Sequence, residues 1–147
     1  MADVIVVSDS AKVRDEVISS IFDPTTTVRQ LTRGKEVRPA VADSTPDLVV
    51  LDQQIGKMGG MATCLDLRLE ESGGRLPHVP VLLLLDRRAD VFLARRAGAD
   101  GWVVKPFDTI RLAKGVQTLL NGGIYQDEAY LPLTVFPVAS RTADAVG

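Results

Sequence analysis

The stretch Asp47-Leu48-Val49-Val50-Leu51-Asp52 gives the clearest strand signal in this 147-residue chain. Its four consecutive aliphatic residues predict a strand buried on both faces, because a strand with one solvated face would alternate apolar and polar residues. The run is preceded by Thr45-Pro46 and stops at Asp52. A loop with three glycines follows it, at Gly56, Gly59 and Gly60. The stretch therefore predicts a core strand of a parallel sheet that ends in a carboxylate.

Similar apolar runs recur along the chain and alternate with segments of helical periodicity. The other expected strands are 4–7, 25–31, 81–85 and 101–104. The first expected helix carries Val13, Val17 and Ile21 and is capped by Ser10 or Asp9, and a weak second helix over 34–43 should be kinked or shortened by Pro39. A third helix carries Met61, Leu65 and Leu69, and a short fourth helix covers 90–97. The last helix is capped by Asp108 and carries Leu112, Val116, Leu119 and Leu120. Five strands alternating with five helices predict an α/β fold, a doubly wound five-stranded parallel sheet.

Composition narrows the class of protein. The net charge of −2 and the pI of about 5.4 argue against nucleic acid as a partner, because phosphate binding needs a cationic surplus. The single cysteine, Cys64, cannot form an internal disulfide and indicates a reducing, cytoplasmic location. The longest apolar run, 79–85, is too short to cross a bilayer, so no membrane association is expected.

Polar residues stand where the predicted strands end. They are Ser8 and Asp9 after the first strand, Asp52 after the third, Asp86 directly after the apolar Leu85 at the end of the fourth, and Lys105 after the fifth. In a doubly wound sheet, functional residues gather at the carboxyl ends of the strands. Charged groups at the ends of apolar runs are costly to bury unless they interact with one another. The sequence therefore predicts a functional site that brings these residues together.

Three pieces of the chain resemble the response-regulator receiver family, which has a flavodoxin-like fold. Residues 46–52, followed by Gly60, match the strand that ends in the family's phospho-acceptor aspartate. Residues 97–107 match the fifth-strand signature, and Asp9 with Arg14 matches the end of the first strand. The resemblance covers about residues 1–123, which are expected to form one receiver domain.

The resemblance implies roles for individual residues. Asp52 would accept a phosphoryl group, and the Lys105 ammonium would pair with the acyl phosphate, helped by a cis bond to Pro106. Mg²⁺ would be held by Asp9, Asp52 and the backbone carbonyl of Gln54. Such a protein is a signalling module and not an enzyme. It would receive phosphate from a histidine kinase or phosphotransfer protein and bind a protein target through the helix 90–97, the strand 101–104 and the last helix.

The chain departs from the family pattern at three places. Ser8 stands where receivers usually carry a second acid, and Leu85 stands where a serine or threonine hydroxyl normally meets the phosphate. Asp86 would repel a phosphoryl group if it pointed inward. The switch aromatic is the bulky Trp102, for which a large rotation is not expected. These departures keep open a second interpretation, a receiver that acts as a phosphorylation-independent interaction module.

Each of these residues also has an ordinary structural interpretation. Asp52 could be a turn residue, Asp9 only a helix cap, Lys105 a surface lysine, Trp102 a core residue and Asp86 a helix-start residue. The only histidine, His78, is expected on the surface. A third hypothesis is a small enzyme or ligand-binding protein on a flavodoxin-like sheet. It would need a glycine-rich phosphate loop after the first strand, and residues 8–12 contain no glycine.

Residues 124–147 are expected to form a tail that carries no output domain. Within it, residues 131–138 are unusually apolar for a free tail. They are expected to dock back on the domain or to add to another protomer, which would make a homodimer.

Overall fold

The structure is a computed structural model that describes residues 2–21 and 23–126. Its strands are β1 (Ala2–Val7), β2 (Thr26–Leu31), β3 (Leu48–Asp52), β4 (Val81–Leu85), β5 (Gly101–Val104) and β6 (Tyr125–Gln126). Its helices are α1 (Ala11–Ile21), α2 (Val37–Asp43), α3 (Gly60–Ser72), α4 (Val91–Arg96) and α5 (Thr109–Leu120), with short 3₁₀ turns at η1 (Gly34–Glu36) and η2 (Arg88–Asp90).

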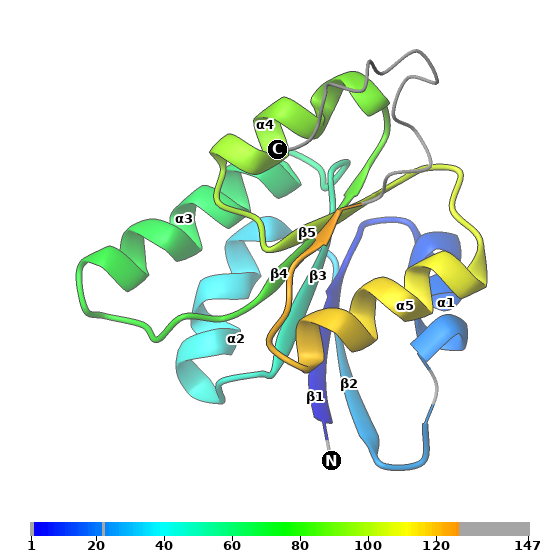
Figure 1. Cartoon of the computed structure of the whole chain (residues 1–147). Coiled ribbons are helices and arrows are strands. Elements are labelled where there is room, and N and C mark those ends of the chain that lie inside the picture. Colours follow the sequence, from blue (N-terminus) through cyan, green and yellow to red (C-terminus); the bar gives the residue numbers. More distant parts are fainter. Residues whose placement is uncertain (1, 22, 127–147) are drawn as a thin grey trace, which may run out of the picture.

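All strands run parallel in the order β2-β1-β3-β4-β5-β6 (Figure 1). This confirms the predicted doubly wound sheet, to which β6 adds a short strand that the sequence did not predict. The chain moves outward from β1 to β2 and then returns to place β3 on the other side of β1. Strand order therefore reverses between β1 and β3, so the ends of these two strands flank the position where such folds bind ligands.

Two apolar layers hold the helices against the sheet. One layer joins alternate strand residues to α2, α3 and α4, and the other joins the remaining strand residues to α1 and α5. Figure 1 shows the same division of the helices between the two faces. β3 and β4 are buried along their whole length, as their unbroken aliphatic sequences predicted. Covering both faces leaves the ends of the strands as the place where polar side chains can collect.

The inward faces of α1 and α5 agree with the sequence. Val17 is fully buried on α1, and Leu112, Val116 and Leu119 are buried on α5. Asp108 caps α5, because its Oδ1 accepts a hydrogen bond of 2.6 Å from the Arg111 amide. Of the two caps proposed for α1, the structure uses Ser10, whose hydroxyl accepts from the Val13 amide at 3.3 Å.

The three apolar residues that marked α3 in the sequence do not all face the sheet, because only Met61 packs against the core. Leu65 and Leu69 are exposed, whereas the buried positions are Gly60, Thr63, Cys64 and Leu67. The first turn of α3 is pressed against the end of β3, which fixes the rotation of the helix. The residues three, four and seven positions after Gly60 therefore face the sheet, although Thr63 and Cys64 have small side chains.

The two short helices begin later than predicted. The segment over 34–43 opens with the 3₁₀ turn η1, and α2 starts at Val37. Pro39 then lies in the first turn of α2, where an amide hydrogen would have no partner within the helix, so the proline shortens the helix without kinking it. The segment over 90–97 is likewise α4 preceded by η2.

The sheet continues past the predicted domain boundary at Gly123. Tyr125 and Gln126 pair in parallel with Gly101 and Trp102 of β5. A side chain at position 101 could not fit, because its Cβ would lie 2.7 Å from the Tyr125 carbonyl oxygen. The apolar stretch 131–138, for which docking was predicted, lies outside the described residues. Within the described residues, no helix is long and apolar enough to cross a membrane.

The packing of α3 predicts an unreactive thiol. Cys64 is fully buried, and this burial raises its pKa from 9.0 to about 11. The thiolate fraction at neutral pH should therefore be about a hundredfold lower than for an unperturbed cysteine. Ellman's reagent should label the native chain more slowly than the urea-unfolded chain by at least that factor. Equal rates in the two states would contradict the buried position of Cys64.

Candidate functional site

The site is built around an ion pair between a buried aspartate at the end of β3 and a partly exposed lysine after β5. Asp52 is only 1 % exposed, and its Oδ1 lies 2.5 Å from the Lys105 Nζ. The Lys105 amide donates to the Leu85 carbonyl at 2.7 Å, which ties the start of the lysine loop to the end of β4. The bond between Lys105 and Pro106 is cis, as the resemblance implied. The two residues predicted to be central are thus in direct contact.

Two further donors satisfy the Asp52 carboxylate. The Ser8 hydroxyl, which is fully buried, donates to Oδ2 at 2.7 Å. The Gln54 amide donates to Oδ1 at 3.1 Å. A carboxylate taken out of water needs such partners, because desolvation of an unpaired charge is costly. At the position where receivers usually carry a second acid, Ser8 therefore supplies a hydroxyl that stabilises the charge of Asp52.

The surroundings also act on Lys105. Burial alone would lower its pKa, but hydrogen bonds from the ammonium to Asp52 and Asp86, together with their negative charges, outweigh this effect and raise the pKa. Lys105 is therefore held as a cation, and its side chain is 22 % exposed. A fixed cation at this edge can stabilise the negative charge of Asp52 or of a group bound to one of its oxygens.

Asp86 is a full member of the site, and the structural interpretation of this residue as a helix start is wrong. Its Oδ1 lies 3.0 Å from the Lys105 Nζ, and its Oδ2 accepts a hydrogen bond of 2.8 Å from the Gln54 side chain. The residues at the N-caps of η2 and α4 are Arg87 and Asp90. Asp86 points toward the ammonium because the chain has to pass Lys105 as it leaves β4.

Asp9 lies at the outer rim of the site and does not cap α1. It is exposed, and its Oδ2 accepts a hydrogen bond of 3.0 Å from the Gly56 amide. Arg14, which was paired with it in the sequence, donates instead to the Ser8 carbonyl at 2.6 Å. Asp9 therefore connects the end of β1 to the loop after β3, on the opposite side of Asp52 from Asp86.

The oxygen groups at this edge suit a hard cation. In the described part of the chain, no three His, Cys, Asp or Glu residues form a cluster that could hold a metal by themselves. The Mg²⁺ that the sequence resemblance implies keeps several waters and needs only one or two carboxylates. Asp9 has an exposed carboxylate, whereas Asp52 already accepts three hydrogen bonds. The exposed carboxylate of Asp9 therefore fits a Mg²⁺ that keeps several of its waters.

The two remaining predicted positions, Leu85 and Trp102, are core residues. Leu85 is fully buried and Trp102 is 3 % exposed, and both lie in the apolar layer under α2, α3 and α4. The Arg95 guanidinium sits 5.4 Å from the centre of the Trp102 ring. No hydroxyl is therefore available from Leu85, and the side chain of Trp102 is enclosed.

One residue of the site was missed by sequence analysis. The Gln53 side chain accepts from the Asp86 amide at 2.8 Å and donates to the Asp90 Oδ2 at 3.0 Å. The pKa of Asp90 is lowered, first by its hydrogen bond from Arg87 and then by the one from Gln53. A glutamine next to Asp52 gave no signal of its own, because its role depends on the path of the loop after β4.

The loop after β3 closes at Gly60, the glycine singled out in the sequence. A Cβ at this position would lie 2.5 Å from the Asp52 carbonyl oxygen. The Gly60 amide donates to the Gln53 carbonyl at 3.1 Å, so the loop folds back directly on the end of β3. Only glycine permits this approach, which holds Gln53 and Gln54 in place.

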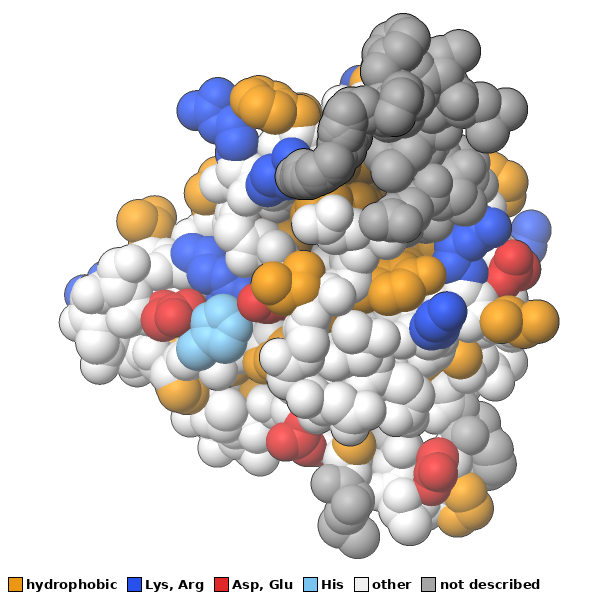
Figure 2. Space-filling view, in the orientation of Figure 1, with side chains coloured by type: hydrophobic (Ala, Val, Ile, Leu, Met, Phe, Trp, Pro, Cys, Tyr) orange, Lys and Arg blue, Asp and Glu red, His pale blue; other side chains and the backbone are white. Residues whose placement is uncertain are grey.

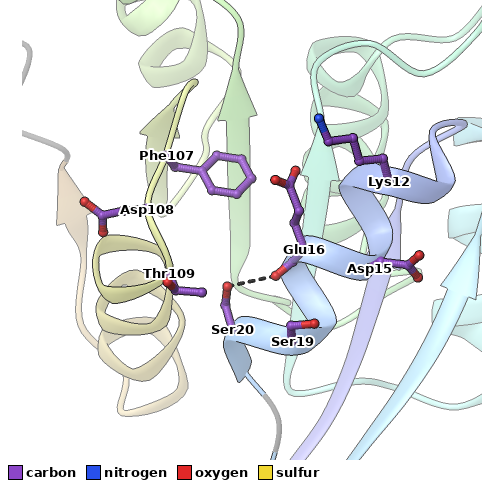
Figure 3. Close-up of a pocket in the computed structure, with 8 residues that line it drawn as sticks. All are labelled: Lys12, Asp15, Glu16, Ser19, Ser20, Phe107, Asp108 and Thr109. Atoms are coloured by element: carbon purple, nitrogen blue, oxygen red, sulfur yellow. Dashed lines mark hydrogen bonds between the residues drawn. The ribbon is translucent and has the colours of Figure 1, made fainter.

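A groove lies beside this edge, between α1 and the loop that leads into α5 (Figure 3). It has a volume of about 680 Å³, and Figure 3 shows Lys12 and Glu16 of α1 facing Phe107 across it. A smaller hollow of about 220 Å³ is lined by Lys12, Glu16, Phe107 and Lys105. The surface from Lys105 to α1 is therefore recessed.

The fold and the site define a receiver, in which a buried strand-end aspartate faces a lysine across the carboxyl edge of a parallel sheet. Residues 4–117 match the family described as the response regulator receiver domain. The chain belongs to this family, the signalling module of two-component systems. Histidine kinases are the partners of receiver domains in these systems.

Similar proteins agree with this assignment. The DNA-binding dual master transcriptional regulator RpaA of Synechocystis is 29 % identical over 123 residues, which are 82 % of this chain and 50 % of that protein. The response regulator MprA of Mycolicibacterium vanbaalenii is 31 % identical over 118 residues, 80 % of this chain and 50 % of MprA. The chain thus spans about half the length of these relatives.

Solved structures show the same fold. The chemotaxis response regulator CheY4 of Vibrio cholerae superposes with a TM-score of 0.70 at 26 % identity, covering 81 % of this chain and 98 % of that one. The receiver domain of NtrX from Brucella abortus gives a TM-score of 0.69 at 25 % identity, with coverage of 81 % and 98 %.

The close approach at Gly60 predicts a cost for any side chain there. Gly60→Ala should lower the free energy of unfolding by about 1–3 kcal/mol, because the new Cβ must push away the Asp52 backbone. Gly59→Ala is a matched control, since its Cβ would meet nothing closer than 3.3 Å. Urea unfolding measures both changes. A loss in Gly60→Ala no larger than in Gly59→Ala would contradict the geometry.

The lowered pKa of Asp90 predicts a contribution to acid stability. Because this pKa lies below its usual 3.8 in the folded protein, the carboxylate stabilises the fold above pH 3.8. This contribution is lost as the pH falls through the folded-state pKa. Asp90→Asn should therefore show a shallower decline of unfolding free energy on acidification than the wild type, measured by urea titrations at several pH values. Equal slopes would refute the prediction.

Proposed function

We propose that this chain accepts a phosphoryl group on Asp52 and signals by binding another protein. The observation that carries the proposal is the contact of 2.5 Å between the Lys105 Nζ and a buried Asp52 oxygen at the carboxyl edge of the sheet. A strand-end aspartate that served only as a turn residue would have no reason to be buried and paired with a lysine.

The proposed chemistry is the transfer of a phosphoryl group from the donor to a carboxylate. A carboxylate oxygen of Asp52 attacks the phosphorus of the donor, the bond from phosphorus to the donor atom breaks, and an acyl phosphate forms. Lys105 pairs with the phosphoryl oxygens, and the Ser8 hydroxyl and Gln54 amide hold the carboxylate in position. This work consists of positioning and charge stabilisation.

Asp9, Asp52 and the Gln54 backbone carbonyl are the groups that would hold Mg²⁺. When bound, the ion would neutralise charge on the phosphoryl oxygens. Asp9 supplies an exposed carboxylate at the rim, where a hydrated cation can be accommodated.

The phosphoryl donor is proposed to be a histidine kinase or a phosphotransfer protein in the cytoplasm. The groove between α1 and the loop after Lys105 supports this, because it is recessed and continues to the ammonium. Its lining mixes charged groups with the Phe107 ring (Figure 3), which suits the side of a protein helix better than a small molecule.

The target is proposed to bind at α4, β5 and α5. On α4, Phe92 is 60 % exposed and Leu93 is 50 % exposed, next to Arg95 and Arg96. Figure 2 shows basic and hydrophobic side chains side by side on this part of the surface. Such a mixture suits a protein target or a second copy of the chain. The net charge of −2 gives no support to nucleic acid or a membrane surface as the partner.

The alternative is a receiver that binds its target without phosphorylation. Leu85 favours this alternative, because it is a fully buried apolar residue at the position where a hydroxyl would contact the phosphate. Without that hydroxyl, the phosphoryl group would lack a hydrogen bond to the end of β4, through which phosphorylation could affect α4.

Acetyl phosphate with Mg²⁺ tests the first proposal. Intact mass should show one added phosphoryl group on the wild type and none on Asp52→Asn. Asp43→Asn, at the exposed end of α2, makes the same charge change away from the site and should be labelled like the wild type. No labelling under conditions that modify another receiver would support the phosphorylation-independent alternative.

A further inference from the structure

The Asp86 carboxylate is held in place from two sides. Its Oδ2 accepts from the Gln54 side-chain amide at 2.8 Å, and its own backbone amide donates to the Gln53 side chain at 2.8 Å. Its Oδ1 is then aimed at the Lys105 ammonium, 3.0 Å away. Two consecutive glutamines of the loop after β3 thus direct the carboxylate that follows β4 toward the lysine.

Lys105 is therefore shared between two anions. An ammonium has three N–H donors, and two of them are engaged by Asp52 and Asp86. A phosphoryl group on Asp52 would bring oxygens that need the same ammonium. With two donors engaged, Lys105 has only one N–H left for the several oxygens of a phosphoryl group. Asp86 also places a negative charge on the side of the lysine where those oxygens would arrive.

We infer that Asp86 is an internal anion that occupies Lys105 and must be displaced when an oxyanion binds at Asp52. The inference rests on the proposed function and deepens it by assigning a residue that restricts the site. Displacement is feasible because the pair is not sealed in the core. The Asp86 side chain is 28 % exposed and Lys105 is 22 % exposed, so water can solvate the released carboxylate.

The inference differs from a purely structural salt bridge in what it predicts for anions. A structural pair would affect stability and leave anion binding unchanged. A competing pair makes Lys105 more available when the Asp86 charge is removed. Asp86→Asn keeps the size of the side chain and an oxygen that can accept from Lys105, but it removes the charge.

Sulfate is the first probe, because it is a tetrahedral oxyanion that cannot be transferred. Binding is followed in the full chain by the NMR shifts of the Gln54 and Lys105 amides. Asp86→Asn should bind sulfate more tightly than the wild type by on the order of tenfold, as expected for removing one charge next to the site. Asp43→Asn is the control for net charge and should match the wild type.

A sulfate affinity of Asp86→Asn within about twofold of the wild type would overturn the inference. The same result in both Asp86→Asn and Asp43→Asn would also overturn it, because the effect would then come from net charge alone. Urea unfolding of each variant establishes that it is folded at the temperature of the titration.

Labelling by acetyl phosphate separates this inference from the proposed function. If Asp86→Asn binds sulfate more tightly and is also phosphorylated faster than the wild type, both are supported. If it binds sulfate more tightly but no variant is labelled, the role of Asp86 stands and phosphoryl transfer to Asp52 is refuted. If the wild type is labelled and neither sulfate affinity nor labelling rate changes, Asp86 is not a competitor.

Discussion

The rest of the site depends on the burial of one carboxylate. Asp52 is held at the end of a strand that is covered on both faces, so its charge has to be balanced by partners within the protein. The main partner, Lys105, leaves β5, and β4 lies between β3 and β5 in the sheet. The lysine must therefore reach across the end of β4 to contact Asp52. This geometry places the residue that follows β4 beside the ammonium, and in this chain that residue is Asp86.

The sequence predicted this arrangement at the level of strand ends. Unbroken aliphatic runs identified β3 and β4, and the rule for doubly wound sheets placed Asp52 and Lys105 at one edge of the sheet. The glycine at position 60 was part of the resemblance to receivers, and the structure explains it by the contact with the Asp52 backbone. The apolar runs predicted where the parallel strands end, and the resemblance to receivers predicted which of the residues at those ends act together.

The sequence did not predict features that depend on how elements rotate or on the path of a loop. The inward face of α3 was misassigned because its buried positions include Gly60 and Thr63, which carry no hydrophobic signal. Asp86 was interpreted as a helix start because nothing in the sequence shows that η2 begins after it. The role of Gln53 depends on contacts with residues 33 and 37 positions away, which one sequence without a structure cannot supply.

The two departures at Ser8 and Asp86 alter the charge of the site in a consistent way. At the end of β1, a position that usually carries an acid holds a hydroxyl that donates to Asp52, so the side that would bind a cation is less negative. At the end of β4, a carboxylate faces Lys105, so the side that would bind phosphoryl oxygens is more negative. Phosphoryl transfer would need a cation bound on one side of Asp52 and phosphoryl oxygens bound on the other. The change at Ser8 weakens cation binding, and the change at Asp86 weakens binding of the phosphoryl oxygens. The hydrogen bonds that stabilise this site in its unmodified form are therefore the same ones that a phosphoryl group has to rearrange.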